Sequence, residues 1–396
     1  MTGTTAYCTI LSTNYLPKAL ALAESLRRHQ DGASLTVLVI DAQSQADLPD
    51  LPEVDLVGTD VLGLPIDELH EVAMIYDLVE FATAVKPLLL KHLLESHEAA
   101  FYLDPDTYLT SPMEELAAEL AASEGGILLT PHFLEPLPAD APTTEGHLLT
   151  VGVFNLGFCG VDRRGLAFLD WWWGHLRTEC LFDFLSGLFV DQKWMDIGNT
   201  LFQARSLRHP GYNVSVVNLH ERPIGQENGG LVIQSTGVPL RLFHFHAFDT
   251  ARPEELSTRH DRSTAHLRSE SAALDALCKE YAEIVIGKQE ALPPAPPYAY
   301  AHDTRGKRIS RQLRRAYRVG CTGGERLPSP FVPAEADAFE AWRRRAWKPE
   351  AREVIGDALK SMRMSLPEEY ARVKNRFPGL AGRLRGGFVR ADGIWG

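Results

Sequence analysis

The chain has 396 residues, of which 45% are hydrophobic and 23% charged, and its formal net charge is -12. This composition supplies enough apolar material for a large core and excludes a wholly disordered chain. The five cysteines include no CxxC pair, which predicts reduced thiols in a cytoplasmic protein and argues against a disulfide framework or a structural zinc site. No apolar run is long enough to predict a membrane-spanning helix.

The charge is distributed unevenly along the chain. Residues 301–396 hold 21 Lys and Arg against 11 Asp and Glu, so this segment is basic and the rest is acidic. One interpretation is two helical surfaces of opposite sign that pack together or are solvated. The other is a basic region that contacts an anionic partner, such as a membrane surface. We favour the first, because only charge supports the second. We expect no nucleic-acid binding, because the body is acidic and no recognised module is present.

Strands and helices are predicted to alternate in the N-terminal part. Residues 6–11, 35–40 and 99–103 are apolar and predict buried strands. Residues 14–29 and 81–95 have helical spacing, with Pro17 in a first helical turn and Pro87 at a helix start or a kink. Apolar strands that alternate with helices are typical of a parallel sheet covered on both faces. The sequence therefore predicts an α/β domain.

The remaining elements complete this domain and add a basic region. We predict helices at 111–123, 166–176 and 265–285, strands at 126–130 and 151–161, a loop at 131–146 and a final core strand at 240–248. A proline-rich linker at 291–303 precedes basic helices at 306–319 and 334–347. We expect a catalytic domain over residues 1–255, a helix and linker over 256–303 and a basic helical region over 304–396.

Asp104 and Asp106 directly follow the strand at 99–103, in the stretch YLDPDTYL. Side chains two apart on an extended segment point the same way, and α/β sheets bind ligands at the carboxyl ends of strands. Two carboxylates on one side need a cation, and a divalent metal completed by phosphate oxygens is the natural candidate. Taken alone, the pair is equally consistent with a solvated turn.

A second alternative is a haloacid dehalogenase-type phosphatase, in which two aspartates two apart act as nucleophile and general acid. That family's pattern is DxDx(T/V), whereas position 108 is Tyr and the motif falls late in the chain. We therefore favour this alternative less.

Several segments, in order, resemble glycosyltransferase family 8 and its relatives. They are ILSTNYLPKALALAESL, FATAVKPLLL, YLDPDTYL, VFNLGF, VDQKW and LFHFHAF. The resemblance covers roughly residues 5–255 and depends on the order of the segments, since no single motif is strong. It implies a GT-A fold, an α/β fold with a Rossmann-like mixed sheet, to which the mainly helical basic C-terminal region is an extension.

The resemblance also implies a role for each matching residue. Asp104, Asp106 and His244 would hold Mn²⁺ or Mg²⁺. Asp191 and Gln192 would lie beside the anomeric carbon as the catalytic pair. The nucleotide-diphosphate sugar would be contacted by Thr9, Asn14, Tyr15, Lys86, Asn155 and Arg252.

The segment around His244 departs from the family pattern. The glycine of the HxxG motif is Ala247, and the lysine and proline that usually follow are Thr250 and Ala251. Arg252 lies two positions beyond the lysine position and is the alternative contact to the diphosphate. His246 shares a strand face with His244, so either imidazole can be the ligand.

The implied activity is retaining glycosyl transfer to a hydroxyl of a sugar, glycan, lipid-linked or small-molecule acceptor. Candidate acceptor contacts are Asn213, Asn218, His220, Glu221 and the Trp171–Trp173 run. The alternative is a non-catalytic module of GT-A shape that binds nucleotide sugars or glycans. In either case we expect a cytoplasmic protein, with peripheral membrane contact through the basic helices as an option.

Overall fold

The structure, a computed structural model, describes residues 4–138, 144–259 and 263–376. The chain separates into two compact units. The first comprises Met1–Gly63, Ala82–Phe182 and Leu188–Tyr298, and the second comprises Leu64–Phe81, Asp183–Gly187 and Ala299–Gly396. In the part of the chain that is described, no helix combines the length and the apolar character needed to cross a membrane.

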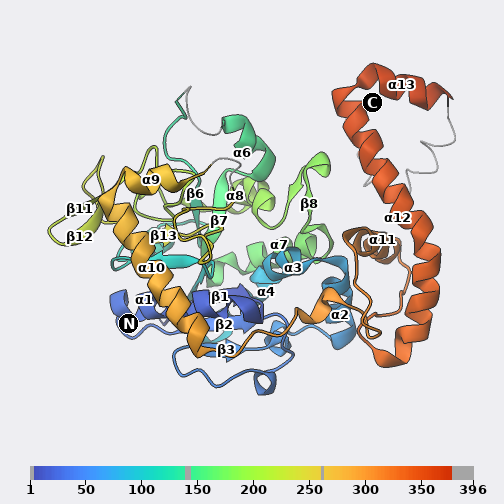
Figure 1. Cartoon of the computed structure of the whole chain (residues 1–396), viewed down its shortest axis with the longest axis horizontal. Coiled ribbons are helices and arrows are strands. Elements are labelled where there is room, and N and C mark those ends of the chain that lie inside the picture. Colours follow the sequence, from blue (N-terminus) through green and yellow to red (C-terminus); the bar gives the residue numbers. More distant parts are fainter. Residues whose placement is uncertain (1–3, 139–143, 260–262, 377–396) are drawn as a thin grey trace. The chain divides into compact units, whose positions relative to one another are not determined.

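A seven-stranded sheet forms the centre of the first unit (Figure 1). Its order is β10 (Arg205–Ser206), β6 (Ile127–Pro131), β7 (Phe154–Asp162), β4 (Ala99–Leu103), β1 (Thr5–Leu11), β2 (Leu35–Val39) and β3 (Asp55–Val57). β1 pairs in parallel with β2 and β4, whereas β7 runs antiparallel between β4 and β6. The predicted α/β class is confirmed, and the sheet is mixed because β7 reverses direction.

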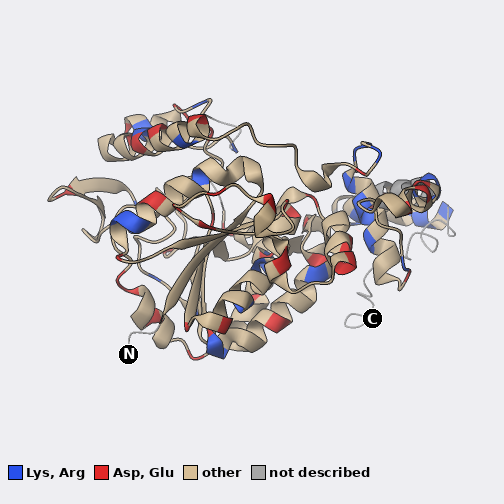
Figure 2. Cartoon of the chain, turned by 90° about the horizontal axis from the view of Figure 1, so that it is seen from below, with Lys and Arg blue, Asp and Glu red and all other residues tan. Residues whose placement is uncertain are grey.

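Helices lie on both faces of this sheet (Figure 2). The helices of the first unit include α1 (Leu16–His29), α4 (Lys86–Ser96), α5 (Leu116–Ala121), α6 (Glu145–Val151), α7 (Leu166–Glu179), α8 (Met195–Phe202), α9 (Ala265–Ser269) and α10 (Ala272–Ala291). Leu16, Leu22 and Leu26 of α1 belong to the same buried cluster as Val37 and Val39 of β2. Each such leucine contributes roughly 2 kcal/mol through burial, so the apolar spacing noted in the sequence holds α1 on the sheet.

Several predicted elements have different boundaries; the helix expected at 265–285, for example, is divided into α9 and α10. The helix expected at 81–95 is divided into α3 (Leu78–Ala84) and α4, and Pro87 lies in the first turn of α4, where its missing N–H is harmless. The long core strand expected at 240–248 is wrong. Only β13 (Leu242–His244) forms, and it pairs with β5 (Thr107–Leu109) outside the main sheet.

The remaining strands are short. β11 (Ile224–Glu227) and β12 (Gly230–Ile233) form a hairpin, and β8 (Phe182–Asp183) and β9 (Leu188–Phe189) lie where the chain leaves the first unit and re-enters it.

The second unit contains α2 (Ile66–Ile75), α11 (Arg311–Thr322), α12 (Ala336–Ser365) and α13 (Pro367–Arg376). α11 packs against α2 and α12, and Figure 2 shows Lys and Arg positions along the helices of this unit. Arg315 is buried and its guanidinium donates to both carboxylate oxygens of Glu80, which is completely buried. The predicted basic helices are present, and part of their charge is used inside the unit.

Candidate functional site

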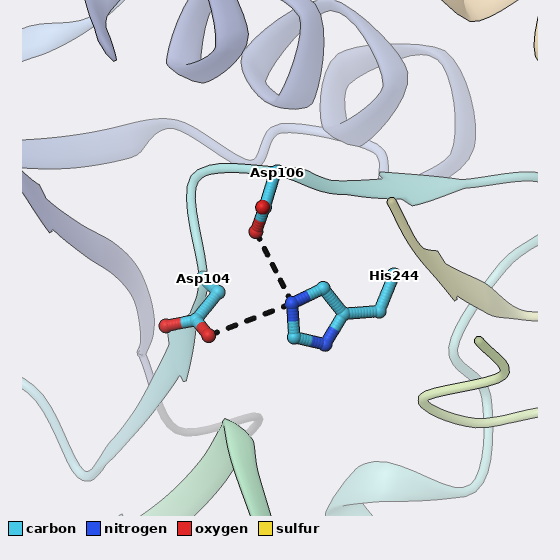
Figure 3. A group of neighbouring side chains, drawn as sticks. All are labelled: Asp104, Asp106 and His244. Atoms are coloured by element: carbon cyan, nitrogen blue, oxygen red, sulfur yellow. Dashed lines mark ion pairs between the residues drawn. The ribbon is translucent and has the colours of Figure 1, made fainter. Parts of the chain in front are cut away.

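The three predicted metal ligands lie together at the carboxyl end of β4. Nε2 of His244 is 3.1 Å from Oδ1 of Asp106 and 3.6 Å from Oδ2 of Asp104. Figure 3 shows the ring pointing between the two carboxylates, and one ligand atom of each residue lies within 4.8 Å of the others. Two carboxylate oxygens and an imidazole nitrogen are a donor set that suits Mn²⁺, while the carboxylates alone suit Mg²⁺. The residues present therefore fit a divalent cation.

The backbone around β4 and β5 fixes this arrangement. The Asp104 N–H donates to the carbonyl of Gly157 at 2.9 Å, and the Asp104 carbonyl accepts from the N–H and the hydroxyl of Thr107. The chain therefore turns tightly from β4 into β5. The pairing of β5 with β13 then places His244 opposite Thr107. The turn that we considered as an alternative for the Asp104 and Asp106 pair is present. It also brings both carboxylates close to His244.

Gly157 in β7 leaves space for the His244 ring. A Cβ at this position would lie 2.5 Å from Cε1 and 2.6 Å from Nδ1 of the ring, which is closer than such atoms can approach. The glycine of the VFNLGF segment is thus explained by a close approach, since any larger residue would displace the imidazole.

Asp106 and His244 have pKa values that are shifted in opposite directions. Burial alone would raise the pKa of Asp106, but the adjacent His244 lowers it well below its usual range. Burial alone would lower the pKa of His244, but the carboxylates of Asp106 and Asp104 raise it by more. The two carboxylates therefore favour a positive group at Nε2, either a proton or a metal ion.

A buried ion pair lies beside the triad. Lys86 and Asp191 are 1% and 2% exposed, and the Lys86 ammonium donates to Oδ2 of Asp191 at 2.5 Å and to the Leu156 carbonyl at 3.0 Å. The same nitrogen lies 4.1 Å from the ring centre of Tyr102, whose hydroxyl donates to Asp104 at 2.7 Å. Lys86 is therefore enclosed by protein atoms, and its expected contact with the donor stays a prediction.

Gln192 and Asn155 lie close to this ion pair and are largely buried. The Gln192 amide donates to the Val151 carbonyl at 3.0 Å and accepts from the Leu156 N–H at 3.4 Å. Oδ1 of Asn155 accepts from the Gly157 N–H at 3.0 Å. These bonds fix the orientation of both amides, while their roles toward a sugar stay predictions.

The predicted donor contacts near the end of β1 have different environments. Thr9 is completely buried within β1, and its hydroxyl has no hydrogen-bond partner among the described residues. Asn14 and Tyr15 are exposed on the short 3₁₀ turn that follows the strand. The pKa of Tyr15 is raised, mainly by partial burial and second by the negative charge of Asp106. The Tyr15 ring is therefore close enough to the triad to feel its charge.

Two cations that we did not single out in the sequence act on the triad. The charge of Lys18 acts on Asp106, and that of Arg259 acts on His244. The Lys18 ammonium lies 4.7 Å from the ring centre of Tyr15. Its ammonium also donates to the Phe248 carbonyl at 3.2 Å. The helical pattern of α1 made Lys18 one surface position among several, so the sequence held no signal that its charge acts on Asp106.

Arg259, which we did not single out, lies beside the two histidines, while the expected contact of Arg252 with the diphosphate stays a prediction. The Arg259 guanidinium contacts Nε2 of His246, so His246 is engaged there and His244 alone joins the aspartates. Arg252 is 57% exposed and pairs with Asp249 at 3.7 Å. Arg259 follows His246 by 13 positions, beyond the segment in which the family pattern places a basic residue.

Most residues expected to contact an acceptor are engaged inside the protein. Asn218 is completely buried, and Glu221 accepts the backbone N–H groups of Leu134 and Glu135. Trp172 is buried and donates to the Asp191 carbonyl at 3.3 Å. Asn218 and Trp172 expose almost no surface, whereas Glu221 is half-buried, and the expected contacts of all three with an acceptor stay predictions. His220, Trp171 and Trp173 keep exposed surface and remain candidates.

No protein-family model matches the chain. In sequence it is similar to two Bacillus subtilis (strain 168) proteins. The uncharacterized protein YfnF is 26% identical over 302 residues, which are 74% of this chain and 96% of YfnF. The uncharacterized protein YfnD is 23% identical over 262 residues, which are 63% of this chain and 80% of YfnD.

Among solved structures, the chain is similar to the galactosyltransferase LgtC in complex with donor and acceptor sugar analogues. The identity is 14%, the TM-score is 0.41, and the match covers 74% of this chain and 98% of LgtC. It is also similar to the glycosyltransferase GlyE of Streptococcus pneumoniae TIGR4, with 15% identity, a TM-score of 0.40 and coverage of 74% and 66%. Scores at this level carry no functional conclusion on their own.

Proposed function

We propose that the chain is a metal-dependent glycosyltransferase of GT-A type, which moves a sugar from a nucleotide diphosphate to an acceptor hydroxyl. The observation that carries this proposal is the triad of Asp104, Asp106 and His244 at the carboxyl end of β4, where α/β sheets bind ligands. The ordered resemblance of residues 5–255 to glycosyltransferase family 8 supports it.

The described cations and exposed side chains suit such a donor. A divalent ion held by the triad would neutralise charge on the departing diphosphate. We assign diphosphate binding to Lys18 and Arg259, in place of Arg252, because their charges act on the triad. Tyr15 and Asn14, which are exposed on the turn after β1, are assigned to the nucleoside.

We assign the position beside the anomeric carbon to Gln192, and a supporting role to Asp191. The Asp191 carboxylate is buried and bonded to Lys86, so it would have to lose this ion pair before it could attack a sugar. Breaking a buried ion pair is costly. Of the two routes to retention, this favours attack of the acceptor oxygen on the face from which the diphosphate leaves over a covalent intermediate on Asp191. The acceptor proton then passes to the departing diphosphate oxygen.

The second candidate is a non-catalytic module that binds nucleotide sugars. The burial of Asp191 and Gln192 is the observation that favours it, because residues expected to act on a sugar are enclosed by protein. The phosphatase alternative needs Asp106 as a protonated general acid. The contact of Asp106 with His244 at 3.1 Å opposes that state.

The acceptor stays a prediction: a sugar, glycan, lipid-linked or small-molecule hydroxyl. Peripheral contact with an anionic membrane through exposed cations such as Arg344 and Arg345 of α12 also stays a prediction.

The proposal is tested by Asp106→Asn, compared with Asp170→Asn as a matched control on the exposed surface of α7. A panel of UDP-, GDP- and dTDP-sugars is screened by thermal shift with Mn²⁺, followed by donor hydrolysis and transfer assays. We expect Asp106→Asn to lose about a thousandfold in turnover, the equivalent of roughly 4 kcal/mol, because one ligand of the ion is removed. Asp170→Asn should behave like the wild type.

Three results would separate the candidates. Metal-dependent turnover that survives in Asp106→Asn would contradict the proposal. Metal-dependent donor binding without turnover on any acceptor would favour the non-catalytic module. Phosphate release from an aryl phosphate would favour the phosphatase.

A further inference from the structure

The buried side-chain amide of Asn213 contacts the Nδ1 side of the His244 ring. Asn213 lies between β10 and β11 and is 1% exposed. Its Nδ2 donates to the carbonyl of Asn155 at 3.0 Å and to the hydroxyl of Thr130 at 2.8 Å. A backbone carbonyl can only accept, so these bonds fix which end of the amide is nitrogen and which is oxygen.

The fixed amide determines the tautomer of His244. Oδ1 of Asn213 lies 3.0 Å from Nδ1 of the ring, and an amide oxygen can only accept, so Nδ1 carries the hydrogen. In the neutral imidazole the lone pair is then on Nε2, the atom that faces Asp106 at 3.1 Å and Asp104 at 3.6 Å. A metal ion can bind only to a nitrogen with a lone pair, so this tautomer is the one that can join the carboxylates.

We propose that Asn213 is a positioning residue that holds His244 in its metal-binding tautomer and orientation. The proposal rests on the proposed metal site and deepens it. Because Nδ2 of Asn213 also bonds to the backbone of Asn155, one amide connects the metal ligand to the strand that carries the predicted donor-sugar contact.

The backbone at position 213 supports the same assignment. Asn213 has φ +52°, in the left-handed region, which asparagine and glycine adopt more readily than other residues. Its carbonyl accepts from Nδ2 of Asn218 at 3.3 Å, and Oδ1 of Asn218 accepts the Ser215 N–H at 2.9 Å. Asn218 therefore holds the loop without touching the imidazole, which makes it a control for Asn213.

The test compares Asn213→Gly with Asn218→Ala in the full-length protein. Glycine keeps the left-handed backbone and removes the side chain with its bonds to His244, Thr130 and Asn155, whereas Asn218→Ala loosens the same loop and leaves the His244 contact intact. The dissociation constant of Mn²⁺ is measured without nucleotide by electron paramagnetic resonance of the free ion. We expect Asn213→Gly to weaken binding 10- to 100-fold, as for other residues that orient a metal ligand, and Asn218→Ala to change it less than about threefold.

A second measurement does not depend on either variant folding. Nitrogen-15 NMR of the neutral His244 side chain in the metal-free wild type should show hydrogen on Nδ1, with His244→Gln used for assignment. A neutral ring with hydrogen on Nε2 and none on Nδ1, unchanged Mn²⁺ affinity in Asn213→Gly or equal weakening in both variants would each overturn the inference while leaving the proposed function standing. A wild type that binds no Mn²⁺, with or without a nucleotide, would overturn both.

Discussion

Ala247 has a backbone conformation that favours glycine. Its φ is +55°, and its carbonyl accepts from the N–H of Thr258 at 3.0 Å and from the hydroxyl at 2.9 Å, which hold it in place. This is the position where the family 8 motif has glycine. A Cβ in the left-handed region costs about 1 kcal/mol or more, so Ala247 retains strain directly after the triad's strand.

We predict that Ala247→Gly raises the free energy of unfolding by about 0.5 kcal/mol, because the strain removed exceeds the added entropy of the unfolded chain. Denaturant unfolding measures the change. Ala122→Gly is the matched control, because Ala122 has φ -78° at the end of α5 and should lose stability. Equal destabilisation by both substitutions would show that position 247 is not strained.

At the scale of elements, the carboxyl end of α2 depends on one buried arginine. The guanidinium of Arg314 in α11 donates to the carbonyls of Ala73 at 2.8 Å, Tyr76 at 2.6 Å and Tyr300 at 2.6 Å. The last carbonyls of a helix have no partner within the helix and carry partial negative charge. Arg314 therefore satisfies these groups and joins α2 to a segment more than two hundred positions away.

We predict that Arg314→Met destabilises the second unit by roughly 3 kcal/mol, because several buried carbonyls lose a charged donor. Hydrogen exchange of the α2 amides measures this directly, and protection should fall. Arg345→Met, at an exposed position of α12, is the control and should leave the exchange unchanged. Full protection of α2 in Arg314→Met would contradict the capping role.

The local pattern predicted the elements better than it predicted their contacts. The apolar runs of β1, β2 and β4 and the pair Asp104 and Asp106 were visible because strand burial and the DxD spacing are local features. Arg259 was not singled out, and Asn213 was expected to contact an acceptor and not His244, because the contacts of both depend on chain segments far from them in sequence. Lys86 was expected to contact the donor. The sequence did not show that it would form a buried ion pair with Asp191.

At the scale of the whole molecule, part of the basic C-terminal charge is paired with carboxylates of its own unit. Arg315 and Arg311 pair with Glu80, and Arg343 pairs with Asp303 at 3.0 Å. The first interpretation of the charge asymmetry, two helical surfaces of opposite sign that pack together or are solvated, stays a prediction. A partner for the exposed cations stays a prediction.

We predict that a chain ending at Tyr298 is less soluble and binds more of a hydrophobic dye than the full-length protein. Residues 64–81 would keep the buried Glu80 but lose Arg315, and an unpaired buried charge costs roughly 3–5 kcal/mol. Phe81 would also lose its packing on Tyr300, at 5.8 Å between ring centres. A chain ending at Arg376 is the control. If both truncations behave like the full chain, residues 64–81 fold without the C-terminal helices.

The separate pairing of β5 with β13 has a consequence for how the protein folds. Asp106 and His244 belong to segments that must close a loop of about 140 residues before they meet, and long loops close slowly and at an entropic cost. An ion bound by both would act as a reversible cross-link across that loop. Chelation should therefore loosen this two-stranded pairing before it affects the seven-stranded sheet.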